Sequence, residues 1–119
     1  EWEGTCATLE PNKSVIERFS HPHLAMSLAR IENHFFMNKS FLKDNQLVEE
    51  MPKISHIPGV IVHGRYDMCC PLDNAFELHQ VWPSAELHII RDAGHSSMEP
   101  GTIDALIRAL EGFLPMLAV

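Results

Sequence analysis

The sequence predicts an α/β fold, and two short apolar segments carry this prediction. Residues 60–63 and 86–91 are rich in β-branched side chains and are bounded by turn residues, as is typical of buried strands in a parallel sheet. A helical pattern at residues 73–81 separates the segments, and another follows at 102–117. Right-handed crossovers make the two strands parallel neighbours, so this half is expected to be the end of a doubly wound sheet.

Residues 1–51 are predicted to be mainly helical. Residues 1–10 read as the end of a helix, and Asn12 or Ser14 is expected to cap a short helix that runs to Phe19. The clearest helix spans residues 23–37, where apolar side chains recur at spacings of four, three and four: Leu24, Leu28, Ile31 and Phe35. Residues 41–51 are expected to add a helical turn or two.

A linker at residues 52–59, bracketed by Pro52 and Pro58, leads into the first strand. We place the main boundary here, with a helical portion at 1–51 packed over an α/β portion at 52–119. The last helix is expected to direct one apolar face inward, namely Ile103, Leu106, Leu110 and Phe113.

Composition narrows the functional classes. The formal net charge of the 119 residues is -7, which argues against nucleic acid and anionic membrane surfaces as partners. No apolar stretch approaches the roughly 20 residues needed to span a bilayer. Three cysteines, two of them adjacent, fit neither a disulfide framework nor a zinc site. Reduced thiols in a cytoplasmic protein are the simpler interpretation.

Two ionisable residues follow the predicted strands. Asp67 comes after the first strand and His95 after the second, and parallel strands of an open α/β sheet present their carboxyl ends at the same edge. This is the order of the last two members of the Ser…Asp…His triad of α/β-hydrolases. Taken alone, Asp67 fits a turn former or helix cap better than a catalytic acid, and His95 fits a surface loop; their arrangement together favours catalysis. No serine lies in Gly-x-Ser-x-Gly, so we expect the C-terminal part of a longer protein, inactive by itself.

Two other chemistries are less consistent with the pattern. Cys69 and Cys70 follow the acid instead of occupying a strand–turn–helix elbow, so a cysteine nucleophile is rejected. A few histidines lie near Glu32, but their spacing is not that of a metal site: His21, His23 and His34. Neither a metal nor a cofactor is expected.

Four sequence motifs, in order along the chain, resemble the prolyl iminopeptidase (proline aminopeptidase) family of α/β-hydrolases. Two belong to the α/β portion: Gly64-Arg65-Tyr66-Asp67 with Cys70-Pro71, and Asp92-Ala93-Gly94-His95. Two lie upstream and are similar to short sequence motifs of that family's cap domain: Trp2-Glu3-Gly4, and Ala29-Arg30-Ile31-Glu32-Asn33-His34-Phe35-Phe36. The resemblance implies the C-terminal part of an α/β-hydrolase fold, preceded by part of a helical cap.

The resemblance also implies roles for individual residues. Asp67 and His95 match the acid and the base of the triad. Glu3 and Glu32 match two cap carboxylates that hold the free α-amino group of the substrate. From local pattern alone, Glu3 fits an exposed acid near a chain end better, and Glu32 fits a solvated helix residue equally well. Phe36 matches an aromatic wall of the pyrrolidine pocket, and Cys70 matches a thiol close to the site. Phe35 stands where the family commonly has Tyr, which puts any polar contact from that position in doubt.

The expected function is therefore that of a serine exopeptidase that releases N-terminal proline from peptides, with the rest of the same enzyme required. Another α/β-hydrolase, such as an esterase or epoxide hydrolase, is the alternative enzyme. A non-catalytic interaction module derived from a hydrolase is the alternative from a different class. The isolated chain is expected to aggregate or to need a partner, because absent strands would leave apolar surface open.

Overall fold

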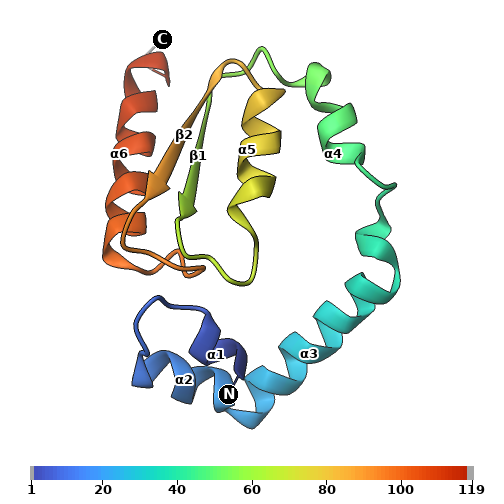
Figure 1. Ribbon diagram of the computed structural model, residues 1–119, viewed down its shortest axis with the longest axis vertical. Helices are drawn as coiled ribbons and strands as arrows, with labels where there is room; N and C mark the ends of the chain where they lie inside the picture. The colour runs from blue at the N-terminus through green and yellow to red at the C-terminus, as the bar shows by residue number, and fades with distance from the viewer. Residues whose placement is uncertain (1, 118–119) are drawn as a thin grey trace.

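The computed structural model describes residues 2–117, apart from the side chains of Glu3 and Leu117. Its chain forms two parts that Figure 1 shows clearly: two strands flanked by helices, and an arc of helices that leads to them. The combination of helices with a small parallel sheet agrees with the α/β prediction as far as this chain extends.

The sheet consists of β1 (Gly59–Gly64) and β2 (Ala85–Ile90), which run parallel with Gly59 opposite Ala85 and Gly64 opposite Ile90. The crossover helix is α5 (Leu72–Gln80), and α6 (Pro100–Leu117) follows β2. These two helices flank the strands from opposite sides (Figure 1). Both strands and both helices were predicted to within about two residues. The parallel order brings the carboxyl ends of β1 and β2 to the same edge.

The first half is helical, as predicted. Its elements are α1 (Trp2–Cys6), α2 (Lys13–Ser20), α3 (Pro22–Met37), the 3₁₀ turn η1 (Lys39–Phe41), α4 (Gln46–Glu49) and the 3₁₀ turn η2 (Met51–Lys53). Asn12 caps α2, since its Oδ1 accepts hydrogen bonds from the backbone N–H groups of Ser14 (3.0 Å) and Val15 (3.3 Å). Pro22 at the first turn fits the start of α3, where its missing N–H is not needed.

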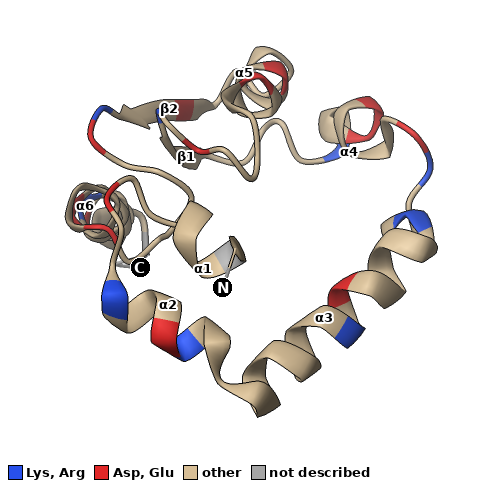
Figure 2. Ribbon diagram, turned by 60° about the horizontal axis from the view of Figure 1, so that its bottom comes forward, with Lys and Arg blue, Asp and Glu red and all other residues tan. Residues whose placement is uncertain are grey.

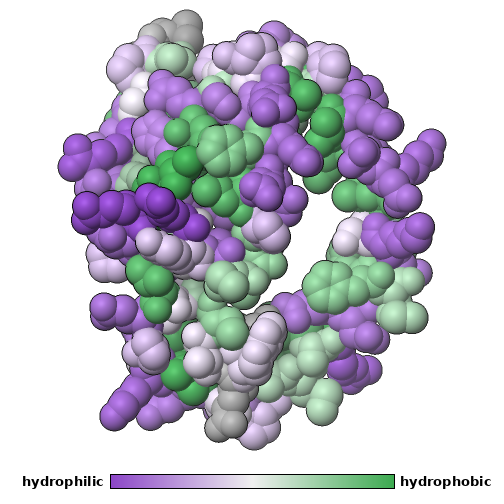
Figure 3. Space-filling model, in the orientation of Figure 1, coloured by the Kyte–Doolittle hydropathy of each residue, from purple (hydrophilic) through white to green (hydrophobic). Residues whose placement is uncertain are grey.

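Much of the apolar stripe on each long helix is exposed, and for α6 this corrects the inward face that the sequence predicted. On α3, Ile31 and Phe35 are 57% and 45% exposed, and on α6 Leu110 is 68% exposed. The periodicity correctly predicted the helices, but no second layer covers these faces in the described chain. In Figure 3 an opening separates the strand-containing part from the arc, with apolar side chains at its border.

The buried core is correspondingly small. Its apolar members are nearly all alanines: Ala7, Met51, Ala75, Ala85, Ala93 and Ala105. No large side chain among the described residues is fully buried. Exposed apolar surface on this scale is typical of protein that another polypeptide covers.

The linker before β1 is anchored to the loop before β2. The Trp82 indole N–H donates to the Ile57 carbonyl at 2.9 Å, and the Ser84 hydroxyl donates to the same oxygen at 2.8 Å. A side chain on Gly59 would run into the Trp82 ring. These contacts fix where β1 begins.

Charged residues are distributed over the described helices and strands. Figure 2 shows basic residues scattered among acidic ones along the helical arc and the strands. None of the described helices combines the length and the apolar character that crossing a bilayer requires.

Candidate active site

Asp67 lies in a turn that ties the ends of both strands together. The Arg65 N–H donates to the Ile90 carbonyl at 2.9 Å, and the Tyr66 N–H donates to the Ala93 carbonyl at 3.0 Å. The turn after β1 is therefore bonded to the loop after β2. It leaves the Asp67 side chain only 6% exposed, facing that loop.

Both carboxylate oxygens of Asp67 are engaged. Oδ1 accepts hydrogen bonds from the backbone N–H groups of Cys69 (2.9 Å) and Cys70 (2.8 Å). Oδ2 lies 2.9 Å from Nδ1 of His95. Burial raises the pKa of Asp67, but the Cys70 N–H, the His95 side chain and the Cys69 N–H together outweigh it and hold that pKa below its ordinary value. Asp67 is thus an ionised acceptor for an imidazole.

His95 lies in the loop between β2 and α6, with its side chain 44% exposed. Since a carboxylate can only accept, Nδ1 carries the proton shared with Asp67, and Nε2 of the neutral ring carries the lone pair. This is the orientation that a general base needs. The structure therefore brings together the two residues predicted to be triad members.

Asp92 is excluded as the partner of His95. Its carboxylate accepts from the Arg91 guanidinium at 2.7 Å, and both side chains are mostly exposed. That hydrogen bond lowers the pKa of Asp92. Of the two aspartates in the motifs of the α/β portion, Asp67 is the one hydrogen-bonded to the imidazole.

A cavity of about 540 Å³ opens beside His95. Its walls come from α1, the α1–α2 loop, α2, α3 and the turn after β1: Trp2, Ala7, Phe19, Leu28, Glu32, Phe36, Met68, Cys69, Cys70 and His95. The predicted residues Glu32, Phe36 and Cys70 thus share one cavity with the imidazole. Glu32 is half-buried and Phe36 is 73% exposed. The side chain of Glu3, the other predicted carboxylate, lies outside the described residues.

Cys70 contributes its backbone to the site. Its N–H donates to Asp67, while its side chain is exposed on the cavity wall. The pair Cys69–Cys70 therefore fixes the acid through two peptide N–H groups. Sequence reasoning identified a thiol near the site but not this role of the main chain.

Side chains that could bind a metal ion cluster at one place in the described chain. Donor atoms of Asp67, Cys69 and His95 lie within 4.8 Å of one another. Two of these three side chains already bond to each other, so an ion would compete with the Asp67–His95 hydrogen bond. The histidines of α3 and its N-terminus, considered above with Glu32, form no such cluster among the described residues.

Two further residues near the site were missed. His63, at the end of β1, has Nε2 3.8 Å from Oδ2 of Asp67, and its Nδ1–H donates to the Gly64 carbonyl at 2.9 Å. Glu99 precedes α6 and is 9% exposed. Its carboxylate accepts from the N–H groups of Gly94 (2.6 Å) and Leu9 (2.8 Å). In the sequence, an acidic residue followed by Pro100 is typical of an ordinary helix start, so no local pattern distinguished Glu99.

Several known proteins are similar in sequence to this chain over most of its length. The chain is 50% identical to a proline iminopeptidase of Xylella fastidiosa over 95% of this chain and 36% of that protein. It is 46% identical to a proline iminopeptidase of Xanthomonas citri over 94% of this chain and 36% of that protein. This chain is a homologue of the proline iminopeptidases.

The homology extends to a plant protein. A proline iminopeptidase of Arabidopsis thaliana is 46% identical over 93% of this chain and 30% of that protein. No family model matches the chain. The resemblance seen in the four motifs is confirmed, and the chain spans about a third of the length of the curated relatives it matches.

Proposed function

We propose that this chain is the part of a serine exopeptidase that supplies the triad acid, the triad base and one side of the pocket for an N-terminal proline. The observation that carries the proposal is the 2.9 Å contact between Asp67 and His95 beside a cavity that also contains Glu32. The names of the homologous proteins support a peptidase function.

The reaction would begin with a serine from polypeptide outside this chain. Nε2 of His95 takes the serine proton as the serine oxygen attacks the carbonyl carbon of the N-terminal proline, and then gives it to the amine of the following residue as the C–N bond breaks. Water repeats the sequence and releases proline. Asp67 keeps the imidazole in the correct tautomer and stabilises the imidazolium. No step requires a metal or a cofactor.

Recognition of the substrate terminus would fall to the cavity. A protonated N-terminal proline has two N–H bonds, and carboxylates in a poorly hydrated pocket are suited to bind it. Glu32 supplies one carboxylate beside apolar side chains, and we assign the second to Glu3 from the family resemblance. Phe36 would pack on the pyrrolidine ring.

Replacing Glu32 tests this assignment in the intact enzyme. Glu32→Gln keeps the shape but removes the charge, so kcat/KM for a prolyl anilide should fall roughly 10- to 100-fold, as expected for a lost bond to a charged group. Glu17→Gln, an exposed acid on α2, is the matched control and should change nothing. An unaltered kcat/KM in Glu32→Gln would refute the amine-binding role.

The general-base assignment has a separate test. His95→Ala should lower kcat by about 10³-fold or more while the thermal unfolding temperature stays close to that of the wild type. Substantial turnover by the variant would rule out His95 as the base.

Another α/β-hydrolase remains the second candidate, because an esterase would use the same Asp67–His95 pair. An esterase has no need of a free amine in its substrate. Cleavage of N-acetylprolyl and prolyl anilides at equal rates would therefore favour this candidate. A non-catalytic module would be indicated if the intact protein does not react with a fluorophosphonate.

A further inference from the structure

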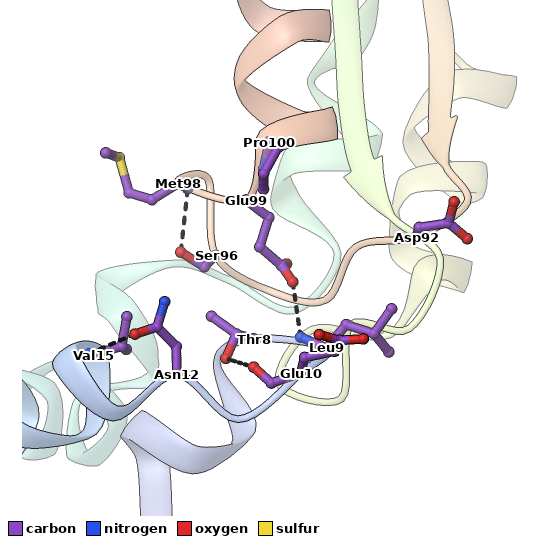
Figure 4. Close-up of a pocket in the computed structure, with 10 residues that line it drawn as sticks. All are labelled: Thr8, Leu9, Glu10, Asn12, Val15, Asp92, Ser96, Met98, Glu99 and Pro100. Carbon is purple, nitrogen blue, oxygen red and sulfur yellow. Dashed lines mark hydrogen bonds between the residues drawn. The ribbon is translucent and has the colours of Figure 1, made fainter.

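The Glu99 carboxylate joins two segments that are distant in sequence. Its Oε2 accepts from the Gly94 N–H at 2.6 Å, and its Oε1 accepts from the Leu9 N–H at 2.8 Å. Figure 4 shows Glu99 reaching from the start of α6 toward the loop that carries Leu9. The interaction spans 90 residues of sequence and lies at a largely buried position.

These bonds hold the loop of His95 on both sides of the imidazole. Gly94 immediately precedes His95, and Ser96, which follows it, donates its N–H to the Ala7 carbonyl at 2.7 Å. The base is thus held between two links that both lead to residues 7–9. A side chain on Gly94 would lie 3.0 Å from the Leu9 nitrogen, so the two backbones are packed with little room to shift.

Residues 7–9 directly follow α1, and α1 provides one wall of the cavity. Trp2 and Ala7 line the same cavity as His95. Glu99, in the loop before α6, therefore links the cavity wall to the loop of the general base. The hydrogen bonds of Glu99 thus connect the segment that follows α1 with the loop of His95.

The chemistry of this contact specifically requires a carboxylate. Both partners are N–H donors, and a carboxylate offers two acceptor oxygens and no donor. Glutamine could satisfy one N–H but would turn its own NH₂ toward the other. Alanine would leave both N–H groups without this acceptor. Bonds to an ionised acceptor are also stronger than those between neutral groups.

We infer that Glu99 is a positioning residue, which fixes His95 for proton transfer and couples its loop to the α1 wall of the cavity. The inference rests on the proposed function, in which His95 is the general base. Proton transfer is sensitive to placement, and a displacement of about 1 Å commonly costs on the order of 100-fold in rate. The effect of Glu99 is therefore expected mainly in the chemical step, with a smaller effect on substrate affinity.

The test uses the intact enzyme with Glu99→Gln, Glu99→Ala and a control, Glu111→Gln, which changes an exposed acid of α6. Two rates are measured: turnover of proline 4-nitroanilide, and covalent labelling by a fluorophosphonate, which needs the base but no proline pocket. We expect Glu99→Gln to lower both kcat and the labelling rate by roughly 10- to 100-fold, with KM within about threefold of wild type. Glu99→Ala should lose more, and Glu111→Gln should match wild type.

Hydrogen exchange supplies the structural readout. At least one of the peptides that contain Leu9 or Gly94 should exchange faster in Glu99→Gln, since glutamine keeps an acceptor for only one of the two N–H groups. Glu99→Gln preserves the volume and one acceptor, so it decides the question even if Glu99→Ala fails to fold.

Three results would overturn the inference. They are a wild-type labelling rate in Glu99→Gln, a loss confined to KM, and a Glu99→Gln protein that does not fold, which would make Glu99 a purely structural residue. Failure of the proposed function looks different. If wild type does not cleave the prolyl anilide but Glu99→Gln still slows labelling, the positioning role stands and the proline assignment falls.

Discussion

At the residue scale, the central observation is a carboxylate whose every oxygen has a defined partner. Asp67 is bonded by two peptide N–H groups on one oxygen and by His95 on the other. The N–H groups fix the orientation of the carboxylate, and the carboxylate in turn fixes the imidazole. Asp67, which the sequence alone would allow to be a simple turn residue, is thus the residue that orients His95, the candidate base.

The depressed pKa of Asp67 makes a prediction about stability and pH. An unfolded aspartate titrates near 3.8, and in the folded chain the hydrogen bonds keep Asp67 ionised to lower pH. The native state then binds fewer protons than the unfolded state around that pH, so its stability increases with pH there. In the intact enzyme, the difference in unfolding free energy between wild type and Asp67→Asn should be fully present above about pH 5 and shrink as pH falls through 3.8 and below.

Denaturant unfolding measured between about pH 3 and pH 6 checks this expectation. A difference between wild type and Asp67→Asn that stays constant over the whole interval would contradict the stabilising ionised state.

At the scale of elements, the site depends on how closely the β1 turn and the β2 loop approach each other. Gly64 ends β1, and a Cβ there would collide with the Gly94 carbonyl oxygen and lie 2.8 Å from that of Ala93. Both obstacles are backbone atoms, so neither can rotate away. A residue without a side chain at the end of β1 therefore allows the loop of His95 to approach Asp67.

Gly64→Ala should push the two loops apart. We expect a loss of about 1–3 kcal/mol of unfolding free energy, as for other overpacked sites, and a fall in kcat of at least roughly 10-fold as His95 leaves Asp67. Thermal unfolding and turnover of a prolyl anilide measure the two effects.

Gly112→Ala is the matched control, because a Cβ at Gly112 of α6 meets nothing within 4 Å. Alanine favours a helix over glycine, so this variant should be neutral or more stable by up to about 1 kcal/mol. Equal behaviour of the two variants would show that the close approach at Gly64 is unimportant.

At the scale of the whole molecule, the chain leaves much of its apolar surface uncovered. Large apolar side chains of α3 and α6 are exposed, including Phe36 at 73% and Leu110 at 68%, and the core is built mainly of alanine. Each strand has one partner in the described chain. Two-stranded sheets of this kind are marginal by themselves in water.

The isolated chain should therefore self-associate. We expect light scattering after gel filtration to show aggregates or oligomers, and co-expression with the remaining part of the enzyme to yield a single complex. A monodisperse monomer with a cooperative melting transition would contradict this prediction. The boundary that we place between residues 1–51 and 52–119 also stays a prediction, and limited proteolysis of the intact enzyme would test it.

The sequence by itself determined the strands, the long helices and the Asp67–His95 pair that follows the strands. Continuous β-branched, apolar runs located both strands, and a period of 3.6 located the long helices. The positions of Asp67 and His95 after parallel strands predicted that the two residues would meet. The four motifs added the family resemblance, which homology confirms. Local sequence patterns were sufficient for these predictions because each pattern spans only a short run of consecutive residues.

Only the tertiary structure decided the rest. It showed that Cys69 and Cys70 hold Asp67 through their peptide N–H groups, and that Glu99 links Gly94 to Leu9 across 90 residues. It also corrected the inward orientation expected for Leu106 and Leu110, which are exposed. Periodicity identifies the apolar face of a helix but not whether another layer covers it. Contacts between distant backbone groups leave no pattern in the sequence, because any residue supplies an N–H and the fold alone brings it to its acceptor.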